Sequence, residues 1–316
     1  MRQYIVRRLL IALPTLLGVT VVAFLMIHLI PGNIVQVMLG TRTDITPEQL
    51  HELYRLYGLN QPLYVQYWHW LSQLFQGNLG FSLRTGLPIA SLISQSFGVT
   101  AELAMGALIL AVMVAVPLGM VAALYQRSAW DYLARGFALI GLIIPNFWLG
   151  TMLVMLTSFY LPVFSVFNYV PFFTNPLANL QDMLVPIITL ALSLMAIITR
   201  MTRAAVLETI GLDHVRTARA KGLRESIVNL RHVLRNSLIP ITTIVGLQFG
   251  YLLGGAIVVE NVFSLPGMGR LIVDAINQRD YPVVQSSVLF VSAVFVLINL
   301  VVDISYGFIN PQIRYQ

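Results

Sequence analysis

The sequence contains no cysteine, and lysine occurs once in 316 residues. Without cysteine the chain has no disulfide, no zinc thiolate site and no thiol chemistry. The single lysine, Lys221, is followed by Gly-Leu, so the G-x-x-x-x-G-K-[ST] loop that cradles nucleotide phosphates is missing. We therefore expect a chain that is not an enzyme and does not hydrolyse nucleotides itself.

Charged residues are also scarce, at 10% of the chain against about 25% in soluble domains, whereas 57% of the residues are hydrophobic. The acidic residues form no spaced metal-binding group, and no series of carboxylates and histidines suited to a proton relay crosses the apolar runs. The net charge of +6 follows from where the arginines lie, so it does not indicate a nucleic-acid partner. The composition predicts a polytopic protein in membrane lipid, with no bound metal.

Six apolar runs approach the roughly 20 residues needed to cross a bilayer, and they predict an all-α fold with six transmembrane helices. Pro145 is expected to kink the third run, and the fourth is expected to continue as a helix into water as far as Ile210. The predicted spans are residues 9–29, 99–124, 134–160, 184–199, 238–259 and 287–308.

Lysine and arginine are distributed unevenly among the segments between the spans. With the N-terminus inside, the inner segments hold 14 of these residues and the outer segments hold 5. Because positive residues stay on the cytoplasmic side, the bias predicts that both termini are cytoplasmic. The expected parts are an N-terminal span 1–32, an extracytoplasmic cap 33–98 and a five-span core 99–316 that carries a cytoplasmic loop 200–237.

Two outer segments are long enough to fold. In residues 33–98, the TPE string at Thr46 is expected to open a helix, and the aromatic-rich stretch QPLYVQYWHWLSQLF follows it. Residues 261–285 are expected to form a turn and an amphipathic helix at the outer surface. Three carboxylates near span ends are expected to take interfacial positions, those of Glu102, Glu260 and Asp303.

Residues 213–236 form a strongly basic stretch between two apolar runs. Gly211 suits a left-handed end for the preceding helix, Asp213 suits an N-cap, and Gly222 suits the next helix end. These signals predict a short helix over residues 214–221, about 12 Å long at roughly 1.5 Å per residue. The plain alternative is positive charge that only fixes topology, although the ordered RTARAKG string goes beyond what topology needs.

A second helical pattern follows the short helix. Its apolar residues are expected to share one face near the membrane surface, with the arginines off that face. The apolar residues are Ile227, Leu230, Leu234 and Leu238, and the arginines are Arg224, Arg231 and Arg235.

The RTARAKG string and the HVLRNSLIP string that ends at Pro240 resemble the cytoplasmic loop of the dipeptide/oligopeptide/nickel family of ABC importer permeases. The general importer loop has E-A-A, three residues, a glycine, nine residues and then I-x-L-P. Here Arg216-Thr217-Ala218 replaces E-A-A and Arg235 takes a proline position, as expected of the peptide-type subgroup. Ordered blocks extend the resemblance over nearly the whole chain: RRLLIALPTLLGVTVVAF, LYGLNQPLYVQYWHW, GNLGFS, IPNFW, TRMTRAAVLE, GGAIVVENVFSLPGMGRLIVDAINQRDYPVVQ and NPQIRY.

The resemblance implies the type I ABC importer permease fold and a place in the bacterial inner membrane. The implied partners are a second homologous permease, two ATP-binding subunits that carry ATP and Mg, and an extracytoplasmic solute-binding protein. No cofactor is expected in this chain itself. Di- or oligopeptides are the expected substrates, and glutathione, nickel chelates, haem and oligosaccharides are alternatives within the family.

The resemblance also implies that residues 214–222 form a coupling helix seated in a groove of an ATP-binding subunit. Small residues in it would allow close approach, and its basic residues would meet acidic groups that set register and steering. The implied coupling residues are Asp213, Arg216, Thr217, Ala218, Arg219, Ala220, Lys221 and Gly222.

Span five carries a ridge of small residues at four-residue spacing, Gly246, Gly250 and Gly254. Such ridges let membrane helices approach closely, so this face is expected either to pack within the subunit or to meet a second permease along the pathway. The resemblance suggests in addition that the outer segment 261–285 contributes to an outer gate and to a docking surface for the binding protein. The candidate residues there are Pro266, Gly267, Gly269, Arg270 and Asp280.

Two other classes of protein stay open from the sequence. An ion-coupled secondary transporter would show inverted repeats with Gly/Pro-broken helices at matched positions, and no such repeat is visible. A channel or receptor would not need a loop that docks an ATPase. ATP-dependent uptake is the property that separates these classes.

Overall fold

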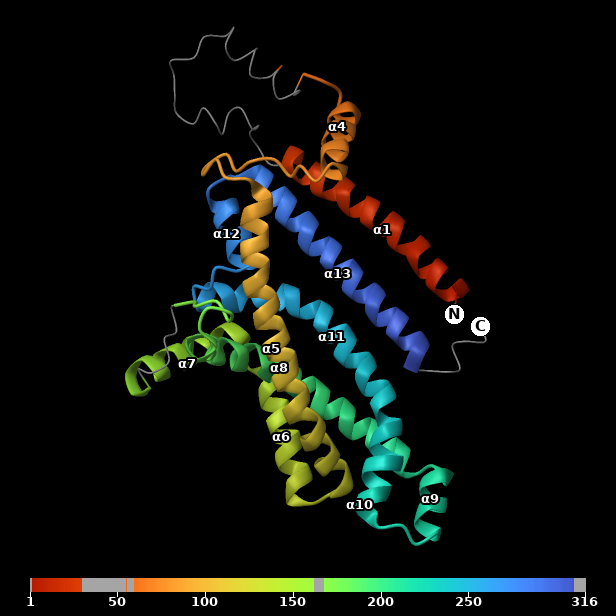
Figure 1. Ribbon diagram of the computed structural model, residues 1–316. Coiled ribbons are helices and arrows are strands. Elements are labelled where there is room, and N and C mark those ends of the chain that lie inside the picture. The colour runs from red at the N-terminus through yellow and green to blue at the C-terminus, as the bar shows by residue number, and fades with distance from the viewer. Residues whose placement is uncertain (1, 30–54, 56–59, 162–167, 310–316) are drawn as a thin grey trace.

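The computed structural model describes residues 2–29, 55, 60–161 and 168–309 (Figure 1). Over these ranges the chain is helical apart from turns and an isolated bridge between Phe81 and Pro88, and the all-α prediction is confirmed. The helices are α1 (Arg2–Leu29), α4 (Leu63–Phe75), α5 (Ile89–Leu124), α6 (Ala129–Ile143), α7 (Asn146–Tyr160), α8 (Pro176–Ile210), α9 (Asp213–Ala220), α10 (Glu225–Ile227), the π-helix η1 (Val228–Leu234), α11 (Arg235–Val262), α12 (Met268–Asn277) and α13 (Tyr281–Ile309).

Four of these helices, α1, α5, α8 and α13, are long and apolar enough to cross a membrane. Two bent pairs, α6 with α7 and the two parts of residues 225–262, bring the number in the described chain to six if each pair is one span. This agrees with the predicted architecture. α8 continues to Ile210 as predicted, whereas α5 begins at Ile89, well before the predicted start at residue 99.

The third predicted span is broken far more sharply than a kink. α6 and α7 meet at 100° around Pro145. Pro145 cannot donate a backbone hydrogen bond, and its ring disfavours the helical conformation in the residue before it. Ile144 accordingly has an extended backbone, with φ −73° and ψ 120°. The segment is therefore two helices of 15 residues each that run in different directions.

α8 is the central helix of the bundle (Figure 1). Two thirds of its most apolar window (67%) is buried, against 11–33% for the other three long helices. α5 packs on it so closely that a Cβ on Gly119 would lie 2.6 Å from the Thr199 carbonyl oxygen. This contact uses a ridge of small residues on α5 that was not predicted from the sequence: Ala104, Ala107, Ala111, Ala115, Gly119 and Ala122, all buried.

α1 and α13 lie side by side along one flank of the bundle (Figure 1). Near their ends Arg8 and Asp303 form an ion pair of 2.8 Å. α4 contacts the other end of α1, where the Tyr67 hydroxyl lies 2.8 Å from Thr20 Oγ1 and the Phe24 ring packs on Trp70. The aromatic part of the predicted cap is therefore a helix, while the helix expected at Thr46 lies outside the described residues.

Candidate functional site

The short basic helix forms as predicted, but its first residues differ from the expectation. The N-cap residue is Leu212, and Asp213 is the first helical residue with no side-chain capping bond. Gly211 is right-handed, with φ −75°. Both predictions were wrong, because the backbone N–H groups of Gly211 and Leu212 turn back to the last carbonyls of α8 and link the two helices without a left-handed residue. The Asp213 carboxylate still lies at the positive end of the helix dipole.

The C-terminal end of α9 agrees with the prediction. Gly222 has φ +74°, a left-handed conformation that other residues rarely adopt. Its N–H donates to the Arg219 carbonyl at 2.9 Å, and the Leu223 N–H donates to the Ala218 carbonyl at 3.4 Å. This pair of bonds is the Schellman arrangement, which ends a helix sharply.

One face of α9 is fixed to the rest of the chain. Val215 and Ala218 are buried in a small apolar cluster with Val206 of α8 and with Val228 and Val233 of η1. Ala218 therefore allows α9 to approach its own subunit, and the interpretation that it faces a partner was wrong. The other predicted coupling residues are exposed: Asp213, Arg216, Thr217, Arg219, Ala220, Lys221 and Gly222.

The charges on the exposed face are only weakly engaged. Arg219 Nε lies 2.9 Å from Glu225 Oε1, and Arg216 lies 3.7 Å from Asp213. All four side chains are exposed by a third or more, and such surface pairs contribute little because water screens them. The face is therefore net basic. Its arginines can replace these weak internal ion pairs with ion pairs to acidic groups on another surface.

The apolar residues predicted to share a face after α9 do not line the interior of the described chain. Ile227, Leu230 and Leu238 are exposed, whereas the buried residues are Val228 and Val233, five positions apart. Residues 228–234 form a π-helix, in which hydrogen bonds run from i to i+5 and each turn takes up an extra residue. That extra residue shifts the inward-facing positions away from those of a regular α-helix.

Polar contacts complete the attachment of the loop. The buried Ser237 hydroxyl lies 3.0 Å from Thr209 Oγ1 on α8 and 3.0 Å from the Val233 carbonyl. Asn236 Nδ2 lies 2.8 Å from His214 Nε2 of α9. These contacts tie α9 and the start of α11 to each other and to α8.

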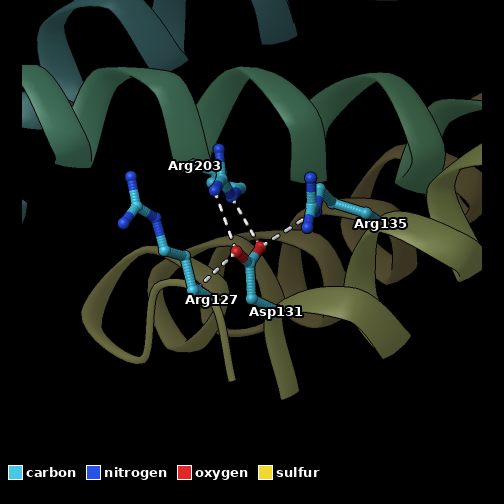
Figure 2. Close-up of polar contacts among 4 residues, drawn as sticks. All are labelled: Arg127, Asp131, Arg135 and Arg203. Atoms are coloured by element: carbon cyan, nitrogen blue, oxygen red, sulfur yellow. Dashed lines mark hydrogen bonds and ion pairs between the residues drawn. The ribbon is translucent and has the colours of Figure 1, made fainter. Parts of the chain in front are cut away.

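A buried carboxylate holds a second turn at the same end of the molecule. Asp131 of α6 is fully buried, and Arg203 of α8 donates to it from Nε at 2.8 Å and from a terminal nitrogen at 3.0 Å (Figure 2). The Arg127 N–H donates to the same carboxylate at 3.0 Å, and Arg135 Nε lies 3.3 Å from it. Because a two-pronged guanidinium pair fixes orientation as well as distance, this Asp131 cluster fixes the α5–α6 turn against α8.

Asp131 is not among the site residues predicted from the sequence. The signal that was present is a lone carboxylate four residues from both Arg127 and Arg135, in an otherwise basic segment. Arg127 has φ +64°, an uncommon backbone conformation outside glycine. The hydrogen bond from its N–H to Asp131 stabilises that turn.

The structure divides the glycine ridge of α11 into two parts. A Cβ on Gly246 would lie 2.6 Å from Val302 of α13, and one on Gly250 would lie 3.0 Å from the Phe295 ring. These two glycines pack within the subunit. A Cβ on Gly254 would meet no atom within 4 Å, so this position is open in the isolated chain.

Valine at Gly246 is expected to lower the free energy of unfolding of the purified subunit by about 1–3 kcal/mol, the usual cost of overpacking. The collision is with Val302, a β-branched side chain with little freedom to move. Gly254→Val is the matched control, and it is expected to leave thermal unfolding in detergent unchanged. Equal losses in the two variants would contradict this division of the ridge.

At the opposite end, Glu260 of α11 is fully buried, so the interfacial position expected for it was wrong. Its carboxylate accepts hydrogen bonds from the backbone N–H groups of Gly269 at 2.7 Å and Arg270 at 3.3 Å. Thr100 Oγ1 donates to Glu260 at 2.6 Å and accepts from the Met268 N–H at 2.8 Å. The carboxylate thus satisfies the free N–H groups at the start of α12, where a negative charge is favoured.

Two of the predicted outer residues are glycines because no side chain fits. A Cβ on Gly267 would lie 2.2 Å from the Glu260 carboxyl carbon, and a Cβ on Gly269 would lie 2.4 Å from Ile257 Cα. Arg270 donates to the Ser264 carbonyl. Pro266 is exposed beside this turn.

Asp280 joins the far end of α12 to the cap. It is buried and accepts hydrogen bonds from the Ser82 hydroxyl and from the Leu83 N–H, the latter at 3.2 Å. Arg84 Nε donates to the Gln278 carbonyl at 2.7 Å. Asp280 therefore serves to attach the cap, and it is withdrawn from the surface where docking was predicted.

A further polar pair joins α5 to the segment before α8. The Tyr169 hydroxyl donates to Glu102 Oε2 at 2.9 Å. Burial, together with this carboxylate, raises the pKa of Tyr169 to about 12. The phenol therefore stays protonated and remains a donor to Glu102 at physiological pH.

A helical chain with several helices long and apolar enough to cross a membrane, and with a short basic helix exposed at one end, has the features of a membrane transport subunit. The comparisons agree. The model of the binding-protein-dependent transport system inner membrane component matches residues 115–315, and the N-terminal model for such membrane components matches residues 1–104. The chain belongs to this family of ABC importer permeases, and it is a multi-pass inner-membrane protein.

Similar proteins match along their whole length. The chain is 40% identical to the dipeptide transport system permease protein DppB of Escherichia coli (strain K12) and 43% identical to the protein of that name from Alkalihalophilus pseudofirmus. It is 42% identical to the glutathione transport system permease protein GsiC of Escherichia coli (strain K12). Each alignment covers 100% of both chains.

Proposed function

We propose that this chain works in an ATP-driven importer in which α9 docks into a groove of an ATP-binding subunit. The complex contains a second homologous permease and two ATP-binding subunits, which bind ATP and Mg. An extracytoplasmic binding protein delivers the substrate. Both termini and α9 are cytoplasmic, in keeping with the excess of positive residues in the inner segments.

The observation that carries this proposal is the two-sided construction of α9. Its outer face is exposed and basic, while Val215 and Ala218 hold its inner face against α8 and η1. α8 in turn packs on α5, α6, α7 and α11. When the ATP-binding subunits close on ATP, they pull α9, and the central helix passes the movement to the other spans. This changes access from the outside to the inside.

We propose peptides as the substrate class, because two of the most similar permeases serve dipeptide transport and another serves glutathione transport. Nickel chelates, haem and oligosaccharides are the alternatives from the wider resemblance. Mass spectrometry of the molecule that copurifies with the cognate binding protein separates them. A retained sugar or metal chelate would contradict the peptide assignment.

Reconstituted vesicles that contain all subunits test the ATP dependence. With the binding protein and a labelled peptide on one side, uptake is expected only when ATP and Mg are supplied on the α9 side. ADP is the control. Uptake driven by an ion gradient without ATP would contradict the proposal and would favour a secondary transporter.

Tryptophan at Gly222 is expected to abolish most peptide uptake in these vesicles while the protein still inserts and assembles. The position is exposed and left-handed, so a bulky residue both strains the end of α9 and obstructs its seating. Asparagine is the matched control, since it tolerates φ > 0 and is small. If the Gly222→Trp complex transported normally, the docking role of α9 would be wrong.

A further inference from the structure

A cavity of about 250 Å³ lies between the end of α5, α6 and α8, next to the Asp131 cluster. It opens where α8 changes from the apolar run 183–199 to a segment with charges at Arg200 and Arg203. The cavity therefore spans the border between apolar and charged surface. Its lining residues are Ala122, Ala134, Arg135, Ala138, Leu139, Leu142, Thr199, Arg200, Arg203 and Ala204.

Three guanidinium groups share the charged side of this cavity with one carboxylate. Arg203 is held by Asp131 in a two-pronged pair, and Arg135 is half-exposed beside the same carboxylate. Arg200 is exposed, and no hydrogen bond or ion pair joins its side chain to the described residues. The cavity thus has a surplus of positive charge, and Arg200 is its unengaged cation.

The lining contains a second unused polar group. Thr199 is 2% exposed, and its hydroxyl has no hydrogen-bond partner within the described chain. A buried hydroxyl without a partner is costly. The rest of the wall is methyl and aliphatic surface from Ala138, Leu139 and Leu142. A ligand that suits this wall combines an anionic, oxygen-rich head with an apolar chain.

We propose that the cavity binds an anionic phospholipid. Its phosphate lies between Arg200 and Arg135, and one acyl chain runs along the aliphatic wall. Basic pockets between membrane helices at the charged edge of the bilayer suit anionic lipid headgroups. The neighbouring surface of α6 is also apolar and exposed, at Leu133, Ile140 and Ile143, so lipid reaches the cavity from the side. The site does not depend on which solute the transporter carries.

Native mass spectrometry of the purified complex tests the proposal, with phosphatidylglycerol and phosphatidylethanolamine of the same acyl chains as probes. The parent complex is expected to retain phosphatidylglycerol preferentially. Arg200→Gln and Arg135→Gln are each expected to reduce that preference about fivefold, the effect of one basic residue near an anionic lipid surface. Arg231→Gln removes an exposed arginine of η1 outside the cavity and is expected to change nothing.

A second variant tests the apolar part of the site independently of charge. Ala204 is exposed at the cavity mouth, so Ala204→Trp fills the mouth from outside and is expected to fold and to lose the bound lipid. An unchanged phosphatidylglycerol preference in Arg200→Gln would overturn the proposal. So would displacement by the soluble headgroup glycerophosphoglycerol at the concentration at which the lipid binds, since that result defines a site for soluble anions.

The alternative to a lipid in this cavity is a side chain or helix of another subunit. Because this chain has no cysteine, a single cysteine introduced at position 204 is the one thiol of the chain, and it reports its surroundings. Labelling by a lipid-phase reagent in the assembled complex is the expected result. Efficient cross-linking from this position to the second permease would overturn the lipid site.

Discussion

Replacing Asp131 by alanine is expected to lower the free energy of unfolding by about 3–5 kcal/mol, because it leaves the partly buried guanidinium of Arg203 without its counter-charge. Asp131 is completely buried, and it also supports the Arg127 backbone. The measurement is thermal unfolding of the purified complex in detergent, together with limited proteolysis at the α5–α6 turn. Faster cleavage there is the local sign that the turn has separated from α8.

Asp274→Ala is the matched control for this variant. Asp274 forms its own ion pair, with Arg270 at 3.7 Å, but more than half of its side chain is exposed. Exposed pairs contribute about 0–1 kcal/mol, so the control is expected to unfold almost like the parent. A double variant with Asp131→Leu and Arg203→Met is expected to recover much of the stability, because it removes both charges at once. Equal losses in the Asp131 and Asp274 variants would rule out a special role for the buried cluster.

The second large effect is expected at the start of α12. Gly267→Ala places a methyl group 2.2 Å from the Glu260 carboxyl carbon. It is expected to lower the free energy of unfolding by about 1–3 kcal/mol and to detach the start of α12 from α11. Glu260→Ala is expected to lower the free energy of unfolding by about 3 kcal/mol or more, since it leaves buried backbone N–H groups without a hydrogen-bond acceptor. Both losses are measured by thermal unfolding and by protease accessibility of residues 268–277.

The double variant distinguishes a specific collision from general damage. Without the Glu260 side chain the Gly267 methyl group has room, so the two losses are expected to fall short of additivity by about 0.5–3 kcal/mol. Gly136→Ala is the control, since a Cβ there meets no atom within 4 Å. Strict additivity of the two changes would show that the proximity of Gly267 to Glu260 has no energetic consequence.

Much of this architecture could be predicted from the sequence because lipid solvation leaves a strong signal. The long apolar runs predict the spans, and the predicted continuation of the fourth span as a helix to Ile210 is confirmed. Gly222 was readable as a helix end because few other residues take its backbone conformation. These features depend on neighbours close in the sequence.

The features that were missed depend on contacts between distant segments. The sequence predicts an interfacial position for Glu260, because its partner Thr100 is 160 residues away and its other partners belong to a turn whose path the local pattern does not fix. Asp131 likewise meets Arg203 across 72 residues. The break at Pro145 was located correctly, but the proline alone does not set an angle of 100°.

The wide turn of η1 affects how the segment between α9 and α11 tolerates changes in length. Val228 and Val233 face inward although five positions separate them, because the helix there is wound with one residue more than usual. If one exposed residue between them were lost, the same two valines would stand four apart, which is the repeat of an ordinary α-helix. The connection from α9 to α11 can therefore absorb a single-residue deletion by rewinding one turn, while both of its ends keep their orientation.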